Sequence, residues 1–162
     1  MTNIQTRNLI PGFVLLAAVS VLSAAYSAQI VGGVRPCVLC LYSRIPWFAA
    51  GGLSLLVVLM AFSGPMRRLL MLLAGLALLG GAALSGYHVG VEQHMWAGPG
   101  TCSAPETMPM SLDQLNAMLQ SATQPRCDSI PWQMWGISLA GFNTIIASAV
   151  GLIALAGARR RG

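Results

Sequence analysis

The sequence predicts an all-α integral membrane protein: a bundle of four transmembrane helices with one long loop outside the membrane. Three observations favour this fold. Of the 162 residues, 56% are hydrophobic and only 8% are charged, whereas a soluble domain carries roughly 25% charged residues. A membrane-spanning helix needs roughly 20 apolar residues, and four longer runs contain no Asp, Glu, Lys or Arg: 8–34, 45–66, 69–91 and 129–158. These runs lack the strict alternation of a membrane β-barrel.

The apolar cores of these runs predict four spans within a single membrane domain, residues 1–162. We expect the spans at about 9–31, 46–63, 69–90 and 134–156, joined on one side by loops at about 32–45 and 91–133. The first run has an alternative interpretation as a cleaved signal peptide. The apolar region of a signal peptide is roughly 7–15 residues long, however, and this run extends to Val31. We therefore interpret it as a helix.

The arginines predict the orientation of the bundle. The side that holds both termini and the 63–68 turn carries six arginines and no acidic residue, whereas the other side carries three arginines and all four acids. Cytoplasmic loops are enriched in positive charge, so we expect both termini in the cytoplasm and the long loop on the opposite side, in the periplasm or its equivalent. The basic residues form no face of the kind that binds nucleic acid, so the lipid bilayer is the expected surroundings.

The long loop contains a pattern for a short helix of its own. Ser111 to Gln114 has the spacing of a capping box, and Leu112, Leu115 and Leu119 follow with the spacing of one apolar helix face. We expect this helix to lie on the membrane surface, although a partner-binding groove would give the same pattern. Tryptophans near the same end of the spans are expected in an interfacial aromatic belt: Trp47, Trp96, Trp132 and Trp135.

All four cysteines fall on the predicted periplasmic side. Cys37 and Cys40 form a C-x-x-C pair at the start of the second span, while Cys102 and Cys127 lie in the long loop. Disulfides persist in an oxidising compartment, and the local pair leaves Cys102 to join Cys127. Both pairs could be structural. A disulfide between Cys37 and Cys40 closes too small a loop to stabilise much, and C-x-x-C is the spacing of redox dithiols. The histidines lack zinc-ligand spacing, so we predict no metal site.

Two features near Cys40 are typical of reactive thiols. The second span begins just after Pro36, so its helix N-terminus is directed at the cysteine sulfurs and stabilises a thiolate. Arg44 follows Cys40 by one helical turn and can share its face. It is either an arginine that extends to the lipid headgroups or a fixed cation beside the Cys40 thiolate and a bound ligand.

These motifs resemble the disulfide bond formation protein B (DsbB) family. The resemblance covers about residues 35–148 and includes CVLC followed by Arg44, GYHVGVEQHMWAGPGTC, CDSIPW and GISLAGFN. It implies a membrane oxidoreductase that reoxidises a DsbA-like periplasmic thiol oxidase and passes the electrons to a membrane quinone, either ubiquinone or menaquinone. It also implies that the partner attacks Cys102 of the Cys102–Cys127 disulfide. Cys37 and Cys40 then receive the electrons, with Cys40 next to the quinone.

The resemblance further implies that Arg44 and His88 contact the quinone. His88 lies at the predicted periplasmic end of the third span, with His94 as a nearby alternative. A histidine that forms one hydrogen bond at the membrane interface would fit the same position. Two other functions stay open. The chain could be a non-catalytic four-helix membrane protein with structural disulfides, or a quinone-linked enzyme similar to vitamin K epoxide reductase, against which the C-x-x-C position argues.

Overall fold

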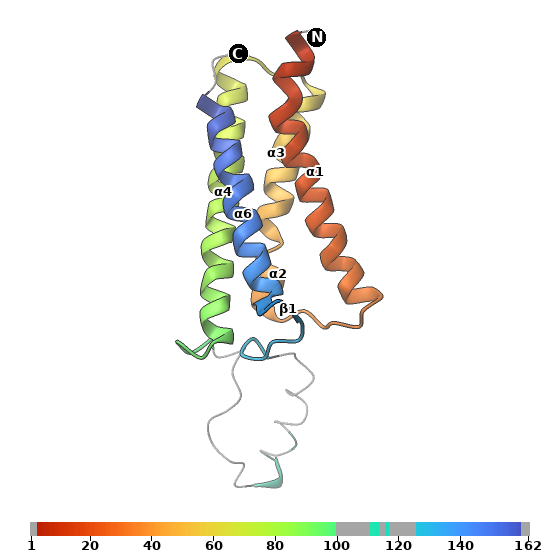
Figure 1. Ribbon diagram of the computed structural model, residues 1–162, viewed down its shortest axis with the longest axis vertical. Coiled ribbons are helices and arrows are strands. Elements are labelled where there is room, and N and C mark those ends of the chain that lie inside the picture. Colours follow the sequence, from red (N-terminus) through yellow and green to blue (C-terminus); the bar gives the residue numbers. More distant parts are fainter. Residues whose placement is uncertain (1–2, 100–110, 114–115, 117–125, 160–162) are drawn as a thin grey trace.

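The computed structural model describes residues 3–99, 111–113, 116 and 126–159 (Figure 1). Its long helices run side by side, and α1 begins and α6 ends at the same end of the bundle. The elements of the bundle are α1 (Asn3–Ile30), α2 (Val38–Tyr42), α3 (Ile45–Leu59), α4 (Gly64–Glu92) and α6 (Leu139–Arg159). The predicted all-α membrane bundle is confirmed. The predicted loop helix falls mostly outside the described residues.

Within the described residues, four helical segments are long and apolar enough to cross a membrane: Asn8–Ile30, Val38–Leu59, Gly64–Glu92 and Leu139–Arg159. Their large apolar side chains are exposed to the outside of the bundle, for example Leu9, Leu16, Leu59, Leu76 and Leu152. A water-soluble domain rarely exposes contiguous apolar patches of this kind. This surface is that of a multi-pass membrane protein.

The interior of the bundle holds many small residues, and glycines bring α4 and α6 close together. A Cβ atom on Gly75 would lie 2.7 Å from the side chain of Leu155 and 3.0 Å from the carbonyl oxygen of Gly151. Gly151 in turn faces the carbonyl oxygen of Gly75. Small residues allow membrane helices to approach with their backbones in near contact, and this approach fixes α4 against α6.

Trp47 lies in the core and not at the membrane interface. Its side chain is only 1% exposed, and its indole N–H donates a hydrogen bond to Oδ1 of Asn143 on α6, at 2.8 Å. The Asn143 amide in turn donates to Ser85 on α4, so the three polar groups link three helices. The expectation of an interfacial belt was therefore wrong for Trp47, because a buried partner on α6 satisfies its indole N–H.

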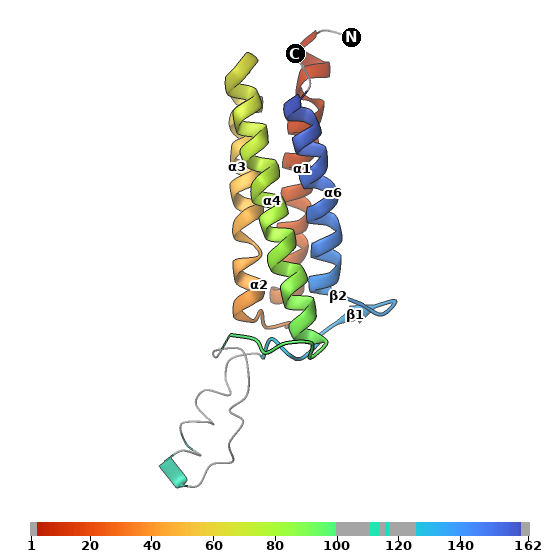
Figure 2. The same cartoon turned by 90° about the vertical axis from the view of Figure 1, so that its left-hand side faces the viewer.

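A short β-hairpin precedes the last helix, where the sequence predicted helix from about residue 134. Strand β1 (Gln133–Met134) pairs antiparallel with β2 (Ile137–Ser138), and the hairpin projects from the end of the bundle (Figure 2). The two turn residues, Trp135 and Gly136, have φ angles of 53° and 78°. Positive φ at both positions suits the right-handed twist of a two-residue hairpin. Helix α6 therefore begins at Leu139.

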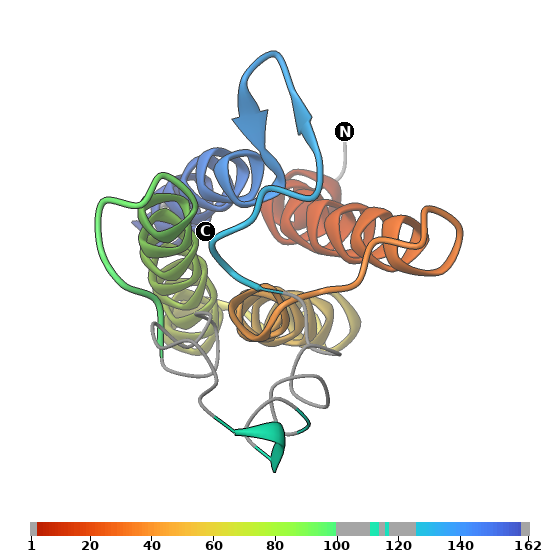
Figure 3. The ribbon, with the colours of Figure 1, turned by 90° about the horizontal axis from the view of Figure 1, so that it is seen from below.

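The second span is interrupted between α2 and α3. Ser43 and Arg44 separate the two helices, and the backbone continues through tight hydrogen bonds, from the Arg44 N–H to the Leu41 carbonyl and from the Trp47 N–H to the Arg44 carbonyl. Seen from the loop end in Figure 3, the connections between helices cross this end of the bundle. The start of the short helix α2 therefore lies beside the described segment that precedes β1.

Candidate functional site

Cys37 and Cys40 lie at the N-terminal end of α2, where Cys37 is the residue that caps the helix. The backbone N–H of Cys40 donates to Sγ of Cys37 at 3.3 Å, and the two sulfur atoms lie 3.0 Å apart. Both cysteines are free thiols. The pKa of Cys37 is lowered to about 4, mainly because Cys40 hydrogen-bonds to its sulfur; the contact with His88 adds to the lowering and burial opposes it.

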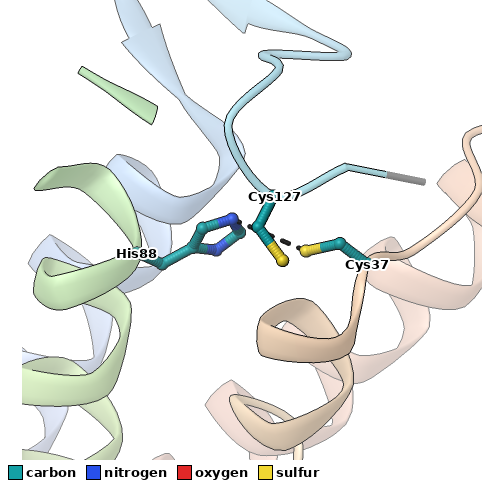
Figure 4. A group of neighbouring side chains, drawn as sticks. All are labelled: Cys37, His88 and Cys127. Carbon is teal, nitrogen blue, oxygen red and sulfur yellow. Dashed lines mark hydrogen bonds between the residues drawn. The ribbon is translucent and has the colours of Figure 1, made fainter. Parts of the chain in front are cut away.

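His88 and Cys127 approach Cys37 from two other parts of the chain (Figure 4). Nε2 of His88, on α4, lies 3.5 Å from Sγ of Cys37. Sγ of Cys37, Sγ of Cys127 and a ring nitrogen of His88 all lie within 4.8 Å of one another, and all three residues are buried. Cys127 is disulfide-bonded. Its predicted partner, Cys102, lies outside the described residues.

The turn around Cys127 is held by its neighbours. The Arg126 guanidinium donates to both carboxylate oxygens of Asp128, at 2.9 and 2.6 Å, and Ser129 Oγ donates to the Arg126 carbonyl. The hydrogen bonds from Arg126, together with its charge, lower the pKa of Asp128. Within this turn, the Cys127 sulfur lies toward that of Cys37 (Figure 4).

A cavity of about 270 Å³ adjoins the cysteine pair. Cys37, Cys40, Arg44 and His88 all belong to its wall, so the structure brings together the described members of the predicted site, with Cys127 beside them. His94, the alternative to His88, is exposed on the turn after α4. Most of the remaining wall is apolar and comes from α1 and α6: Val21, Leu22, Ala24, Ala25, Ala28, Leu139, Ala140, Phe142 and Ile146.

Arg44 is fixed at the cavity wall by α1. Nη1 of Arg44 donates to Oε1 of Gln29 at 3.0 Å, and the guanidinium lies 4.7 Å from the centre of the Tyr26 ring. A guanidinium has five N–H donors, so the bond to Gln29 leaves several for a ligand in the cavity. Neither Gln29 nor Tyr26 was predicted, because contacts between separate membrane helices leave no periodic signal in the sequence.

Glu92 is a further residue of the site that sequence reasoning missed. This last residue of α4 is 5% exposed; its Oε1 lies 3.8 Å from Nε2 of His88, and its Oε2 accepts a hydrogen bond from Ser138. Its position four residues after His88, on the same helix face, was a signal that could have identified it. The contact with Ser138 depends on the hairpin and left no such signal.

The chain is similar to proteins of one known family. Residues 7–157 match the family model described as Disulfide bond formation protein DsbB. The chain is similar to proteins named Disulfide bond formation protein B from Psychrobacter cryohalolentis (32% identity, covering 88% of this chain and 82% of the relative) and from Methylococcus capsulatus (31%, covering 89% and 88%). The relative of that name from Acinetobacter baumannii shares 30% identity, with 81% of this chain and 78% of the relative covered.

No solved structure matches the chain. The family match nevertheless covers nearly all of the chain and includes every cysteine, and the described cysteines meet beside one cavity at the end of a four-helix membrane bundle. The chain therefore belongs to the DsbB family of disulfide bond formation proteins.

Proposed function

We propose that this protein reoxidises a DsbA-like periplasmic thiol oxidase by disulfide exchange and passes the electrons to a membrane quinone. One observation carries the proposal: the Cys127 and Cys37 sulfurs lie within 4.8 Å of each other, while Cys40 faces an apolar cavity. Disulfide exchange needs a thiolate within reach of a disulfide sulfur, and this arrangement supplies a continuous route from the loop to the cavity.

The burial of Cys127 supports the choice of Cys102 as the residue that the partner attacks. Cys127 is 1% exposed, so an external thiolate cannot approach its sulfur. Attack therefore falls on the Cys102 sulfur. A partner–Cys102 disulfide forms, the Cys102–Cys127 bond breaks, and Cys127 leaves as a thiolate. The second thiol of the partner then attacks the mixed disulfide and releases the partner in its oxidised form.

The electron pair next moves to the C-x-x-C cysteines. The Cys127 thiolate attacks Cys37 of the Cys37–Cys40 disulfide, and Cys40 leaves as a thiolate. Cys102 then attacks Cys127, which restores the loop disulfide and releases Cys37. The low pKa of Cys37 makes it a good leaving group in this last step.

The cavity wall fits a quinone head group. A cavity of about 150 Å³ holds a benzene ring, and this one of about 270 Å³ has room for a ring with substituents. Its wall is mostly apolar, and Arg44 and His88 supply polar groups suited to quinone oxygens, next to the Cys40 sulfur. A quinone held there by Arg44 and His88 would supply the acceptor for two electrons and two protons, and the Cys37–Cys40 disulfide would re-form as these electrons leave the sulfurs.

The decisive experiment combines the purified protein with a reduced DsbA-like partner and ubiquinone or menaquinone, and follows quinone reduction by absorbance. We expect catalytic quinone reduction by the wild type and none by Cys40→Ser. The Cys40→Ser variant keeps the loop disulfide, so it should still exchange once with the partner. A wild type that oxidises the partner without reducing either quinone contradicts the proposal. A structural role for both cysteine pairs predicts no partner oxidation at all.

The proposed reaction requires the site to face the periplasm from the bacterial inner membrane, with both termini in the cytoplasm. Reporters fused after Arg68 and after Gly162 should therefore be located in the cytoplasm, and a reporter fused within 103–125 should be located in the periplasm. Moving an arginine to the bilayer centre costs about 2.5–3.5 kcal/mol on insertion scales, so the tail with its three arginines should not cross the membrane. A periplasmic C-terminus contradicts the topology.

A further inference from the structure

Glu92 is a buried acid that the exchange steps do not use. At 5% exposure it needs partners, because a carboxylate removed from water is costly unless other groups compensate its charge. One partner is Ser138, which donates its hydroxyl proton to Oε2. The other is His88, whose Nε2 lies 3.8 Å from Oε1. The same nitrogen lies 3.5 Å from Sγ of Cys37, so the imidazole stands between the carboxylate and the sulfur.

The hairpin holds the carboxylate in this position. The oxygen of Ser138 accepts a hydrogen bond from the backbone N–H of Gly141 at 3.1 Å, so its own proton is free to point at Glu92. The Glu92 oxygen that receives this proton therefore acts as a hydrogen-bond acceptor. The second oxygen then faces the His88 ring. A carboxylate and an imidazole at this separation form an ion pair when the ring carries a proton.

We propose that Glu92 is a positioning residue that keeps His88 protonated beside Cys37, so that His88 holds a proton for the reduction of the ligand in the cavity. This inference rests on the proposed quinone reduction, which consumes two electrons and two protons. The two sulfurs supply the electrons as the Cys37–Cys40 bond forms. At neutral pH the two thiols supply only one of these protons, because the pKa of Cys37 is lowered to about 4.

The second proton comes from the His88 N–H, since His88 lines the same cavity as Cys40. Protons that the partner's thiols release during exchange return His88 to its starting state, so protons and electrons balance over the cycle. Other titratable or charged groups also face the pair or line the cavity beside it. Among the described residues these are Cys37 and Cys40 at the start of α2, Arg35 before it, Arg44 at the start of α3 and Arg126 in the loop. Helix α6 and the hairpin contribute polar groups without charge, Asn143 and Ser138.

The protonation state of the His88 ring can be measured by NMR without quinone. The chain has two histidines, His88 and His94, so ring-nitrogen NMR of ¹⁵N-histidine-labelled protein gives two sets of signals, which a His94→Gln variant assigns. In the oxidised, quinone-free wild type at neutral pH we expect the shifts of a protonated ring at His88. In Glu92→Gln, which keeps the side-chain shape and an acceptor for Ser138, the ratio of protonated to neutral ring should fall at least about tenfold.

Two further variants separate charge from structure. Glu92→Asp keeps the carboxylate and should retain a protonated His88 ring. Asp113→Asn removes an exposed carboxylate far along the sequence from the site and should change nothing. A neutral His88 ring in the oxidised wild type overturns the proposal even if Glu92→Gln fails to fold. An unchanged ring in a folded Glu92→Gln also overturns it.

Kinetics distinguish this inference from the proposed function. With partner and quinone, Glu92→Gln should lower kcat about tenfold or more while the KM for quinone stays within about twofold, because Glu92 acts through the proton on His88. The loss should shrink as the pH is lowered and solvent protonates the ring. A wild type that reduces no quinone contradicts the proposed function and leaves the NMR result standing. A neutral wild-type ring alongside quinone reduction contradicts only the role of Glu92.

Discussion

Replacing Arg44 by lysine keeps a positive charge at the cavity wall and removes the planar guanidinium. In the structure this guanidinium bonds to Gln29 on α1 at 3.0 Å and lies over the Tyr26 ring, with further N–H donors left for the cavity. A lysine ammonium is a compact charge on a flexible stem and does not reproduce this fixed fork of donors. The change therefore separates a quinone contact from an arginine that merely extends to lipid headgroups.

The expected magnitude follows from the bonds that are lost. A hydrogen bond from a charged group contributes about 1.5–3 kcal/mol, and each 1.4 kcal/mol changes an equilibrium about tenfold. Arg44→Lys should therefore raise the apparent KM for quinone about 10- to 100-fold. Arg44→Ala should raise it further, because the stacking on Tyr26, worth about 0.5–1 kcal/mol, and the charge are lost as well.

The assay is steady-state quinone reduction with a saturating reduced partner, together with one turnover of partner oxidation in the absence of added quinone. Both Arg44 variants should complete the single turnover, because the loop disulfide is untouched. Gln29→Ala removes the anchor and keeps the guanidinium, so its effect on KM should be smaller than that of Arg44→Lys. Arg68→Lys, at the opposite end of the bundle, is the control. Wild-type quinone kinetics in Arg44→Ala would refute the reasoning.

Three other predictions follow from the cysteine pair, the loop and the helix packing. In the reduced protein, the ultraviolet absorbance of the Cys37 thiolate should persist down to about pH 4 and fall below it. Cys40→Ala should raise the pKa of Cys37 and weaken this absorbance at neutral pH, and an unchanged pH profile contradicts the assigned cause. In Cys127→Ser the Cys37–Cys40 disulfide can still oxidise Cys102 and the partner, so a disulfide between Cys102 and the partner should accumulate on non-reducing gels. The absence of any adduct argues against the relay. Gly75→Ala should lower the free energy of unfolding by about 1–3 kcal/mol and lower the Tm in detergent. Gly80→Ala is the control, because its new Cβ would have no neighbour within 4 Å, and it should leave the Tm unchanged. Equal effects of the two substitutions contradict the close packing.

The sequence was sufficient to predict the membrane bundle because the bilayer imposes a length and a polarity on each span, and both are visible in one dimension. The positions of Cys37 and Cys40 were predictable for a related reason. A C-x-x-C pair that precedes an apolar run must lie where a helix enters the membrane. Arg44 could be placed near Cys40 because one helical turn separates them, and the structure has both residues at the same cavity.

The remaining features depend on contacts between distant segments. Trp47 fits an interfacial belt by position, and only Asn143, 96 residues later, shows why it is buried. By sequence alone, Glu92 is one of four acids on the loop side of the membrane. Its role depends on the contact with Ser138 of the hairpin, which lies 46 residues later in the chain. That hairpin depends on a positive φ angle at Trp135, a conformation that tryptophan rarely adopts and that no sequence pattern predicted.

The interruption between α2 and α3 limits how far a chemical change at the cysteines can spread. Helix α2 is only five residues long, and in the break after it the Cys40 carbonyl accepts a hydrogen bond from the Ser43 hydroxyl. Forming or breaking the bond between Cys37 and Cys40 can therefore rotate a single helical turn without displacing the Trp47 end of α3, which is locked to α6. The bundle then serves as a stationary frame for the proposed reaction, and the movement that accompanies a change of the Cys37–Cys40 bond is confined to α2, beside the cavity.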